Sequence, residues 1–94
     1  MTEDIAQAVA IELGHILKPG WTFVEEADRF VIAPPNSVTS DAGKMQILLE
    51  EAWRIARFVS YTNHSSISRS ADGSFQIDSH MESGNGFKVF IKAI

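Results

Sequence analysis

Asp78 and His80 are the residues whose types and spacing come nearest to a chemical site in this 94-residue chain. They alternate within a predicted strand, so both side chains would project from the same face. A carboxylate and an imidazole on one face can share a proton or ligate a metal ion. A metal site usually needs three or four protein ligands, and only Glu82 and Asp72 stand nearby, in predicted loops. We therefore predict no metal site, no catalytic residue and no cofactor.

Two other kinds of chemistry lack the spacing that they require. His64 precedes Ser65, but adjacency in sequence is not catalytic geometry, and no Gly-x-Ser-x-Gly motif is present. Gly43 and Lys44 stand at the start of a predicted helix, as in a phosphate-binding loop. The earlier glycine and the following serine or threonine of such a loop are missing. Both patterns favour a chain that is not an enzyme.

Lys88, Phe90 and Lys92 alternate along the last predicted strand and would share a sheet face with His80. An aromatic ring between two bases on an open sheet can stack a single-stranded base. The competing interpretation is that the lysines protect an exposed strand from aggregation. Because the chain has a net charge of −4, we favour protection of the strand and do not expect a duplex nucleic acid as partner. Single-stranded nucleic acid stays the alternative partner.

Hydrophobic periodicity and turn residues predict seven elements in the order α-β-β-α-β-β-β. The predicted helices cover residues 2–17 and 41–62, and the predicted strands cover 21–26, 29–33, 65–70, 74–80 and 87–93. Paired hairpins favour an antiparallel sheet. We expect an α+β two-layer sandwich, with four to five antiparallel strands and two helices on one face. The length predicts one domain over residues 1–94.

Alternation along the predicted strands assigns their side chains to two faces of the sheet. The face toward the helices would carry Trp21, Phe23, Phe30, Ile32, Phe75, Ile77, Phe87, Val89 and Ile91. The opposite face would carry Thr22, Val24, Arg29, Val31, Gln76, Asp78, His80, Lys88, Phe90 and Lys92. Because Val24, Val31 and Phe90 are apolar, the opposite face is either a partner surface or a place where strand-forming residues are left in water.

The second predicted helix is apolar on two sides. One broad stripe would pack on the sheet, whereas Ile47, Phe58 and Tyr61 fall on roughly the opposite side, around Arg54. Arg54 also stands four residues after Glu50, the spacing of a helical ion pair. Aromatic residues and arginine are enriched in interface hot spots. We predict that Ile47, Arg54, Phe58 and Tyr61 form a protein interface; the alternative is that loops bury Phe58 and Tyr61 within the monomer.

Composition narrows the classes of function. The chain has no cysteine, which excludes disulfides, thiolate zinc sites and cysteine nucleophiles. The acidic N-terminus does not resemble a signal peptide, and no run of about 18 apolar residues is present, so we expect neither export nor a membrane partner. These features together favour the cytoplasm.

The absence of catalytic motifs and the second apolar helix side predict a non-catalytic protein-binding module. We expect it to be homodimeric and to act as a small inhibitor or adaptor of a larger protein or complex, as many small mobile-element proteins do. Two alternatives stay open. One is single-stranded nucleic-acid binding on the open sheet face, and the other is a small acidic chaperone.

Overall fold

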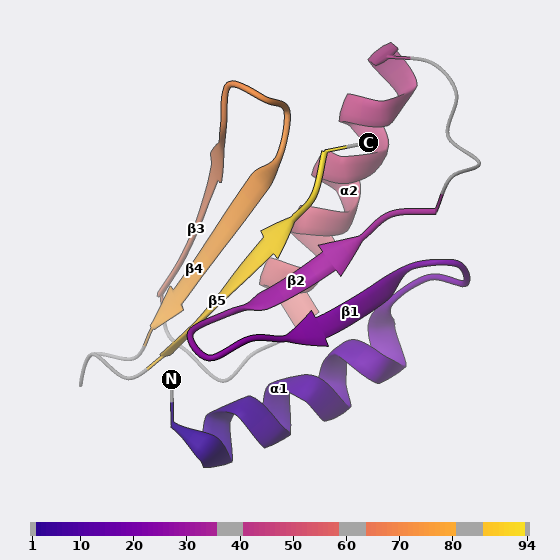
Figure 1. Cartoon of the computed structure of the whole chain (residues 1–94). Coiled ribbons are helices and arrows are strands. Elements are labelled where there is room, and N and C mark those ends of the chain that lie inside the picture. The colour runs from indigo at the N-terminus through magenta and orange to yellow at the C-terminus, as the bar shows by residue number, and fades with distance from the viewer. Residues whose placement is uncertain (1, 36–40, 59–63, 81–85, 94) are drawn as a thin grey trace.

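The computed structural model describes residues 2–35, 41–58, 64–80 and 86–93, without the side chains of residues 41–45, 58 and 64. Its element order confirms the predicted α+β succession (Figure 1). The elements are α1 (Glu3–Ile16), β1 (Thr22–Glu25), β2 (Phe30–Ala33), α2 (Asp41–Phe58), β3 (His64–Arg69), β4 (Phe75–His80) and β5 (Gly86–Ile91). The part of the long helix that we predicted beyond residue 58 lies outside the described residues.

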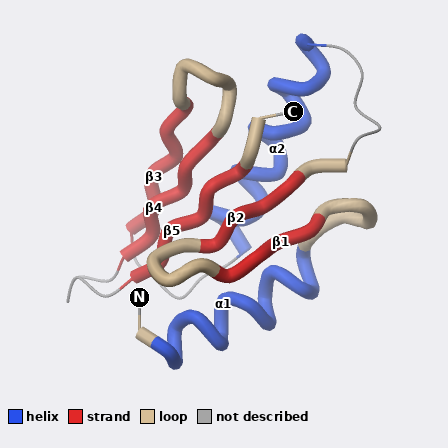
Figure 2. The backbone as a smooth tube through the Cα atoms, in the orientation of Figure 1, coloured by secondary structure: helices blue, strands red, loops and turns tan. Residues whose placement is uncertain are grey.

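The five strands form one sheet in the order β1-β2-β5-β4-β3, so β1 and β3 are its edges (Figure 2). Three neighbouring pairs are antiparallel, as predicted, but β2 and β5 are parallel, with Phe30 beside Val89 and Ile32 beside Ile91. A parallel pair needs a long crossover connection. Here the chain passes through α2 and the β3–β4 hairpin before β5 enters the sheet between β2 and β4.

The core lies between the sheet and the two helices, both of which cover one face; α2 passes behind the sheet in Figure 1. Its fully or nearly buried side chains are Ala6, Val9, Leu13, Phe30, Ile32, Leu48, Ala52, Ile55, Phe75, Ile77, Phe87, Val89 and Ile91. Trp21 and Phe23 pack at its margin, with the Phe23 ring edge-on to Phe30 at 6.1 Å between centroids. This arrangement confirms the predicted helix-facing set of the sheet.

Helix α1 begins and ends where the sequence predicts. The hydroxyl oxygen of Thr2 accepts a hydrogen bond from the Ile5 N–H at 3.3 Å, which satisfies one donor of the first turn. Beyond the helix, Gly20 has a φ of 90°. This left-handed conformation is unfavourable for residues with a Cβ atom, so glycine at this position permits the turn into β1.

The β3–β4 hairpin has a compact loop. The Ser70 N–H donates to the Ser74 carbonyl at 2.9 Å, and the Gly73 N–H donates to the Ser70 carbonyl at 3.0 Å. Gly73 has a φ of 90°, as a three-residue hairpin loop with a left-handed last residue requires. One oxygen of Asp72 accepts from the Ser74 hydroxyl at 2.6 Å and from the Ser74 N–H at 3.0 Å.

These hydrogen bonds predict an acid-sensitive hairpin. The Ser74 hydroxyl, and then the Ser74 N–H, hold the pKa of Asp72 below its ordinary value of 3.8. A carboxylate with a lowered folded-state pKa stabilises the fold above its unfolded-state pKa, and this contribution is lost as the pH falls through the folded-state pKa. We expect the Asp72→Ala destabilisation to be constant near neutral pH and to shrink below pH 3.8.

Urea unfolding at several pH values measures that change, and NMR titration of the Asp72 carboxyl measures its pKa directly. Ser74→Ala is the matched control, because it removes the hydroxyl donor and keeps the carboxylate. In this variant the pKa of Asp72 should rise toward its ordinary value. An unchanged pKa in Ser74→Ala would contradict the assignment.

Candidate functional site

The open face of the sheet carries the residues predicted for it. Lys88 and Phe90 alternate with buried neighbours on β5, and Lys92 follows at the end of the strand. The register places Lys88 opposite Asp78 and Phe90 opposite Gln76. On the other side of Phe90, β2 contributes Val31. His80 is exposed at the end of β4, so this predicted set shares one face.

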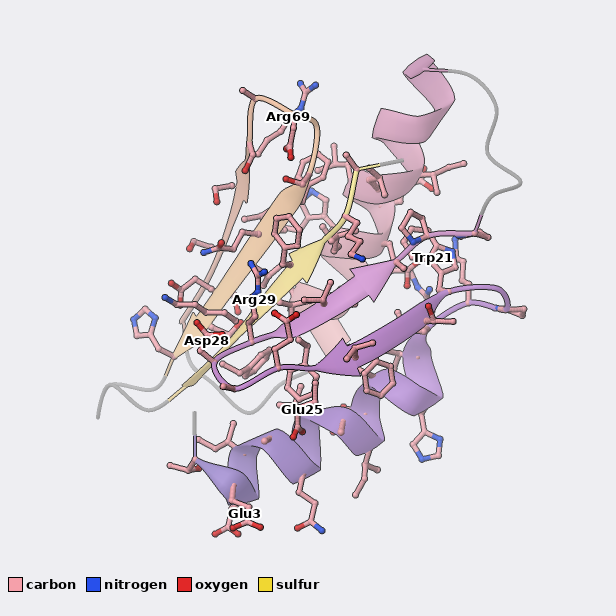
Figure 3. All side chains as sticks on the ribbon, viewed as in Figure 1. Glu3, Trp21, Glu25, Asp28, Arg29 and Arg69 are labelled. Carbon is pink, nitrogen blue, oxygen red and sulfur yellow. The ribbon has the colours of Figure 1, made fainter. Side chains whose placement is uncertain are left out.

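An arginine that the sequence reasoning did not pair covers the centre of this face. The Cζ atom of Arg29 lies 4.8 Å from the centroid of the Phe90 ring, and the Nε atom is 2.9 Å from a carboxylate oxygen of Glu26 (Figure 3). Arginine over a ring face is a favourable cation–π contact. A nucleic-acid base would have to displace this guanidinium in order to stack on Phe90. Nucleic-acid binding on this face therefore stays a prediction that the geometry does not favour.

The strand register gives the neighbours of Asp78 and His80 in the sheet. Asp78 stands opposite Lys88 in the register, and His80 stands opposite Gly86. Within the described part of the chain, no three His, Asp or Glu side chains come together in a way that could hold a metal ion. The register makes Asp78 and Lys88 oppositely charged cross-strand neighbours.

The predicted interface around Arg54 is partly engaged inside the monomer. Nη1 of Arg54 donates to both carboxylate oxygens of Glu51, at 3.0 and 3.1 Å, and Nη2 donates to the Ile16 carbonyl at 2.7 Å. Arg54 therefore ties α2 to the C-terminal end of α1. The predicted pairing with Glu50 is wrong. Arg54 bonds Glu51 instead, whose side chain is turned toward the interior and is 1% exposed.

The other residues of the predicted interface are placed only in part. Ile47 is half-buried on α2, as is Arg54. The side chain of Phe58 and the whole of Tyr61 lie outside the described residues. The interface role of these four residues stays a prediction.

Trp53 is an exposed aromatic residue on α2 that the sequence did not lead us to single out. Trp53 is 62% exposed, a fraction that only Val24 and Ile11 match among the large apolar side chains described. It is on the same side of the helix as Gln46, Glu50 and Arg57, all of which are exposed. The available signal was this large aromatic residue at helical spacing within an otherwise polar stripe.

Trp53 lies beside a surface groove at the edge of the sheet. We name this hollow of about 530 Å³ the α2–β3 groove. It is lined by Trp53, Ala56 and Arg57 of α2 and by Ser65 and Ile67 of β3. β3 is paired with β4 along its length, and the hydroxyls of Ser65 and Ser79 add a hydrogen bond of 2.9 Å between the two strands. The groove therefore combines an aromatic wall, small and aliphatic residues and one guanidinium at a sheet edge.

A second groove of about 610 Å³ lies between α1 and the β1–β2 turn. Its lining includes Glu3, Glu25 and Glu26 beside the exposed Ile11, and Figure 3 shows Glu3 and Glu25 at this end of the molecule. Glu26 is the residue that pairs with Arg29. The acidic character of this groove distinguishes it from the α2–β3 groove.

Comparison with known proteins identifies no relative: no family model, no curated protein and no solved structure matches this chain. In the described helices, no segment combines the length and the apolar character needed to cross a membrane. The α2–β3 groove is the strongest candidate, because it contains a large exposed aromatic side chain next to a sheet edge.

Proposed function

We propose that this chain is a non-catalytic protein-binding module, a small inhibitor or adaptor, whose contact surface is the α2–β3 groove. The observation that carries the proposal is the 62% exposure of Trp53 on this groove. A tryptophan side chain can bury about 150–250 Å². At about 25 cal/mol per Å² of apolar surface, its removal from water stabilises a complex substantially.

The residues that line the groove are more typical of a protein-binding surface than of a catalytic site. Tryptophan and arginine are the types most enriched in interface hot spots, and Trp53 and Arg57 stand together here. Ala56 and Ile67 add apolar surface, and the hydroxyl of Ser65 is hydrogen-bonded to that of Ser79. We place the contact surface at Trp53 rather than at Arg54, because Glu51 and the Ile16 carbonyl already bind the guanidinium of Arg54.

Site-specific photo-cross-linking tests whether protein covers this surface. A photoreactive phenylalanine analogue is placed at position 53 or, as the matched control, at position 24. Trp53 and Val24 are 62% and 63% exposed, but Val24 is on the open sheet face. We expect a covalent adduct with protein from position 53 in cells and little from position 24. The adduct's mass then reports whether the partner is another protein or a second copy of the chain.

Trp53→Ala supplies the quantitative readout with the identified partner. Removing a hot-spot tryptophan should weaken binding by at least about 2 kcal/mol, or about thirtyfold in Kd. Val24→Ala should leave the Kd within about twofold. Equal adducts from positions 53 and 24, or an unchanged Kd for Trp53→Ala, would contradict the proposal.

A further inference from the structure

We infer that the partner in the α2–β3 groove is a second copy of this chain, joined edge to edge through β3 with α2 beside α2. This inference rests on the proposed function, because it names the occupant of the same groove. The two copies are related by one twofold axis, which is perpendicular to the sheet and passes beside Ile67. The two sheets would then form one continuous sheet with both pairs of helices on the same side.

The backbone of β3 is available for such pairing. Among the described strands, β3 pairs with β4 alone. The Ser70 N–H bonds to the Ser74 carbonyl, which makes these two residues a hydrogen-bonded pair of the hairpin. Hydrogen-bonded positions alternate along an antiparallel strand. The N–H and C=O groups of Ser65, Ile67 and Arg69 therefore point away from β4, toward the open edge.

Symmetry restricts the register of two β3 strands. Opposed residues must share a sheet face, and a register centred on Ile67 satisfies this condition. Ile67 then stands opposite Ile67 of the second copy, and Ser65 stands opposite its Arg69. All the outward-pointing residues are used, which gives about six backbone hydrogen bonds. The two Ile67 side chains, which face α2, would meet at the axis next to both copies of Trp53.

The exposed stripe of α2 is complementary to itself in the same arrangement. Glu50 and Arg57 lie about one turn before and one turn after Trp53. Two α2 helices related by this axis run antiparallel, so Trp53 meets its twin and Glu50 faces Arg57 of the second copy. The exchange occurs twice by symmetry. Gln46, whose amide donates to Glu50 at 3.0 Å, holds that carboxylate on the same stripe.

The expected spacing of the helices agrees with the spacing of the strands. Paired strands lie about 4.8 Å apart, so the axis would pass about 2.4 Å outside β3. α2 packs over both β4 and β3. A helix centred between these strands would lie about 5 Å from the axis, and two such helices about 10 Å apart. Packed helices lie about 8–10 Å apart, so one axis can satisfy both contacts.

The opposite edge is less suited to a twin. β1 has four residues, whereas β3 has six. β1 ends at Glu25, next to Glu26, and contains no basic residue, so a second copy of β1 would offer these carboxylates no oppositely charged partner in the ladder. β3 contains neither proline nor lysine, which are residues that commonly protect an edge strand. The charge pattern and the strand length therefore both favour β3.

Because the chain has no cysteine, a single introduced cysteine tests the register directly. In the proposed dimer the two Cα atoms of residue 67 are about 5.5 Å apart, which a disulfide can bridge. The matched control is Ser65→Cys, whose two copies would be about 14 Å apart and out of reach. With oxidised glutathione, we expect a disulfide-linked dimer from Ile67→Cys and monomer from Ser65→Cys on non-reducing gels.

Charge reversal tests the helix contact in solution. By sedimentation equilibrium, Glu50→Arg and Arg57→Glu should each raise the dimer Kd by at least about tenfold, because like charges then face each other. The double variant that carries both reversals should return the Kd to within about threefold of the native value. This rescue distinguishes loss of the contact from loss of the fold. The melting temperature of each variant, followed by circular dichroism, provides an independent check that the fold is retained.

The outcomes separate this inference from the proposed function. A monomer at 100 µM or more, or a failure of Ile67→Cys to cross-link above Ser65→Cys, overturns the dimer. If position 53 still cross-links to a different protein, the proposed function stands without the dimer. If instead the dimer forms and neither charge reversal changes its Kd, the helix contact of the inference is wrong. Rescue by the double reversal and cross-linking at residue 67 together support it.

Discussion

Replacing Arg54 with alanine is expected to lower the free energy of unfolding by about 3 kcal/mol. The substitution leaves the Glu51 carboxylate, which is 1% exposed, without the two bonds from Nη1. An uncompensated buried charge costs more than the intact ion pair contributes. The Ile16 carbonyl at the end of α1 also loses its 2.7 Å donor. The Arg54 side chain is 33% exposed, so we expect the lower part of the usual 3–5 kcal/mol range.

Chemical unfolding of matched variants measures this effect. Gln7→Ala removes an exposed polar side chain from α1, away from the proposed dimer contact, and should change the unfolding free energy by less than about 0.5 kcal/mol. The double variant Glu51→Leu with Arg54→Met removes both charges and should recover much of the loss. A loss below about 1 kcal/mol for Arg54→Ala would show that Glu51 finds other compensation and would contradict our interpretation of this pair.

Replacing Phe30 with alanine is expected to be more severe, with a loss of about 3–5 kcal/mol. Its side chain is fully buried in the centre of the core, edge-on to the ring of Phe23. It stands beside Val89 in the parallel pair of β2 and β5. Alanine there would remove both the buried apolar surface and the aromatic contact, and would leave a cavity.

Total stability makes this loss easy to detect. A domain of this length has a stability of about 5–14 kcal/mol, so Phe30→Ala should strongly lower the melting temperature and can populate the unfolded state. Val24→Ala on the neighbouring strand is the control, because Val24 is 63% exposed and should lose less than about 0.5 kcal/mol. Similar melting temperatures for Phe30→Ala and the native chain would mean that the core is packed differently.

The faces of the elements were predictable from the sequence because each depends on a local period. Phe75 and Ile77 alternate with polar neighbours, Val89 and Ile91 alternate with Lys88, Phe90 and Lys92, and all four of these apolar residues are buried. The Ala71-Asp72-Gly73 turn was predicted as well, since its glycine supplies the left-handed residue of the loop. Such local patterns depend on a few residues in a row and so are visible before any fold is known.

The candidate site was much less predictable. The sequence places Arg54 at helical spacing from Glu50, but only burial decides that Glu51, rather than Glu50, accepts its bonds. Trp53 was overlooked, because it interrupts a polar stripe and belongs to no apolar one. Its importance appears only when β3, which follows α2 in the chain, is seen to line the same groove.

By itself, the sequence determined the seven elements, their order and the helix-facing residues of β1, β2, β4 and β5. It did not predict that Val31, which alternation assigns to the open face, is buried as well. Turn residues and hydrophobic periodicity specify those features locally. The tertiary structure alone decided that β5 lies parallel to β2, that Arg29 covers Phe90, and that α2 and β3 form a groove at an edge. The physical reason is that these contacts join segments far apart in the sequence. Several different pairings of the same strands would bury the same residues, so a hydrophobic pattern does not distinguish between them.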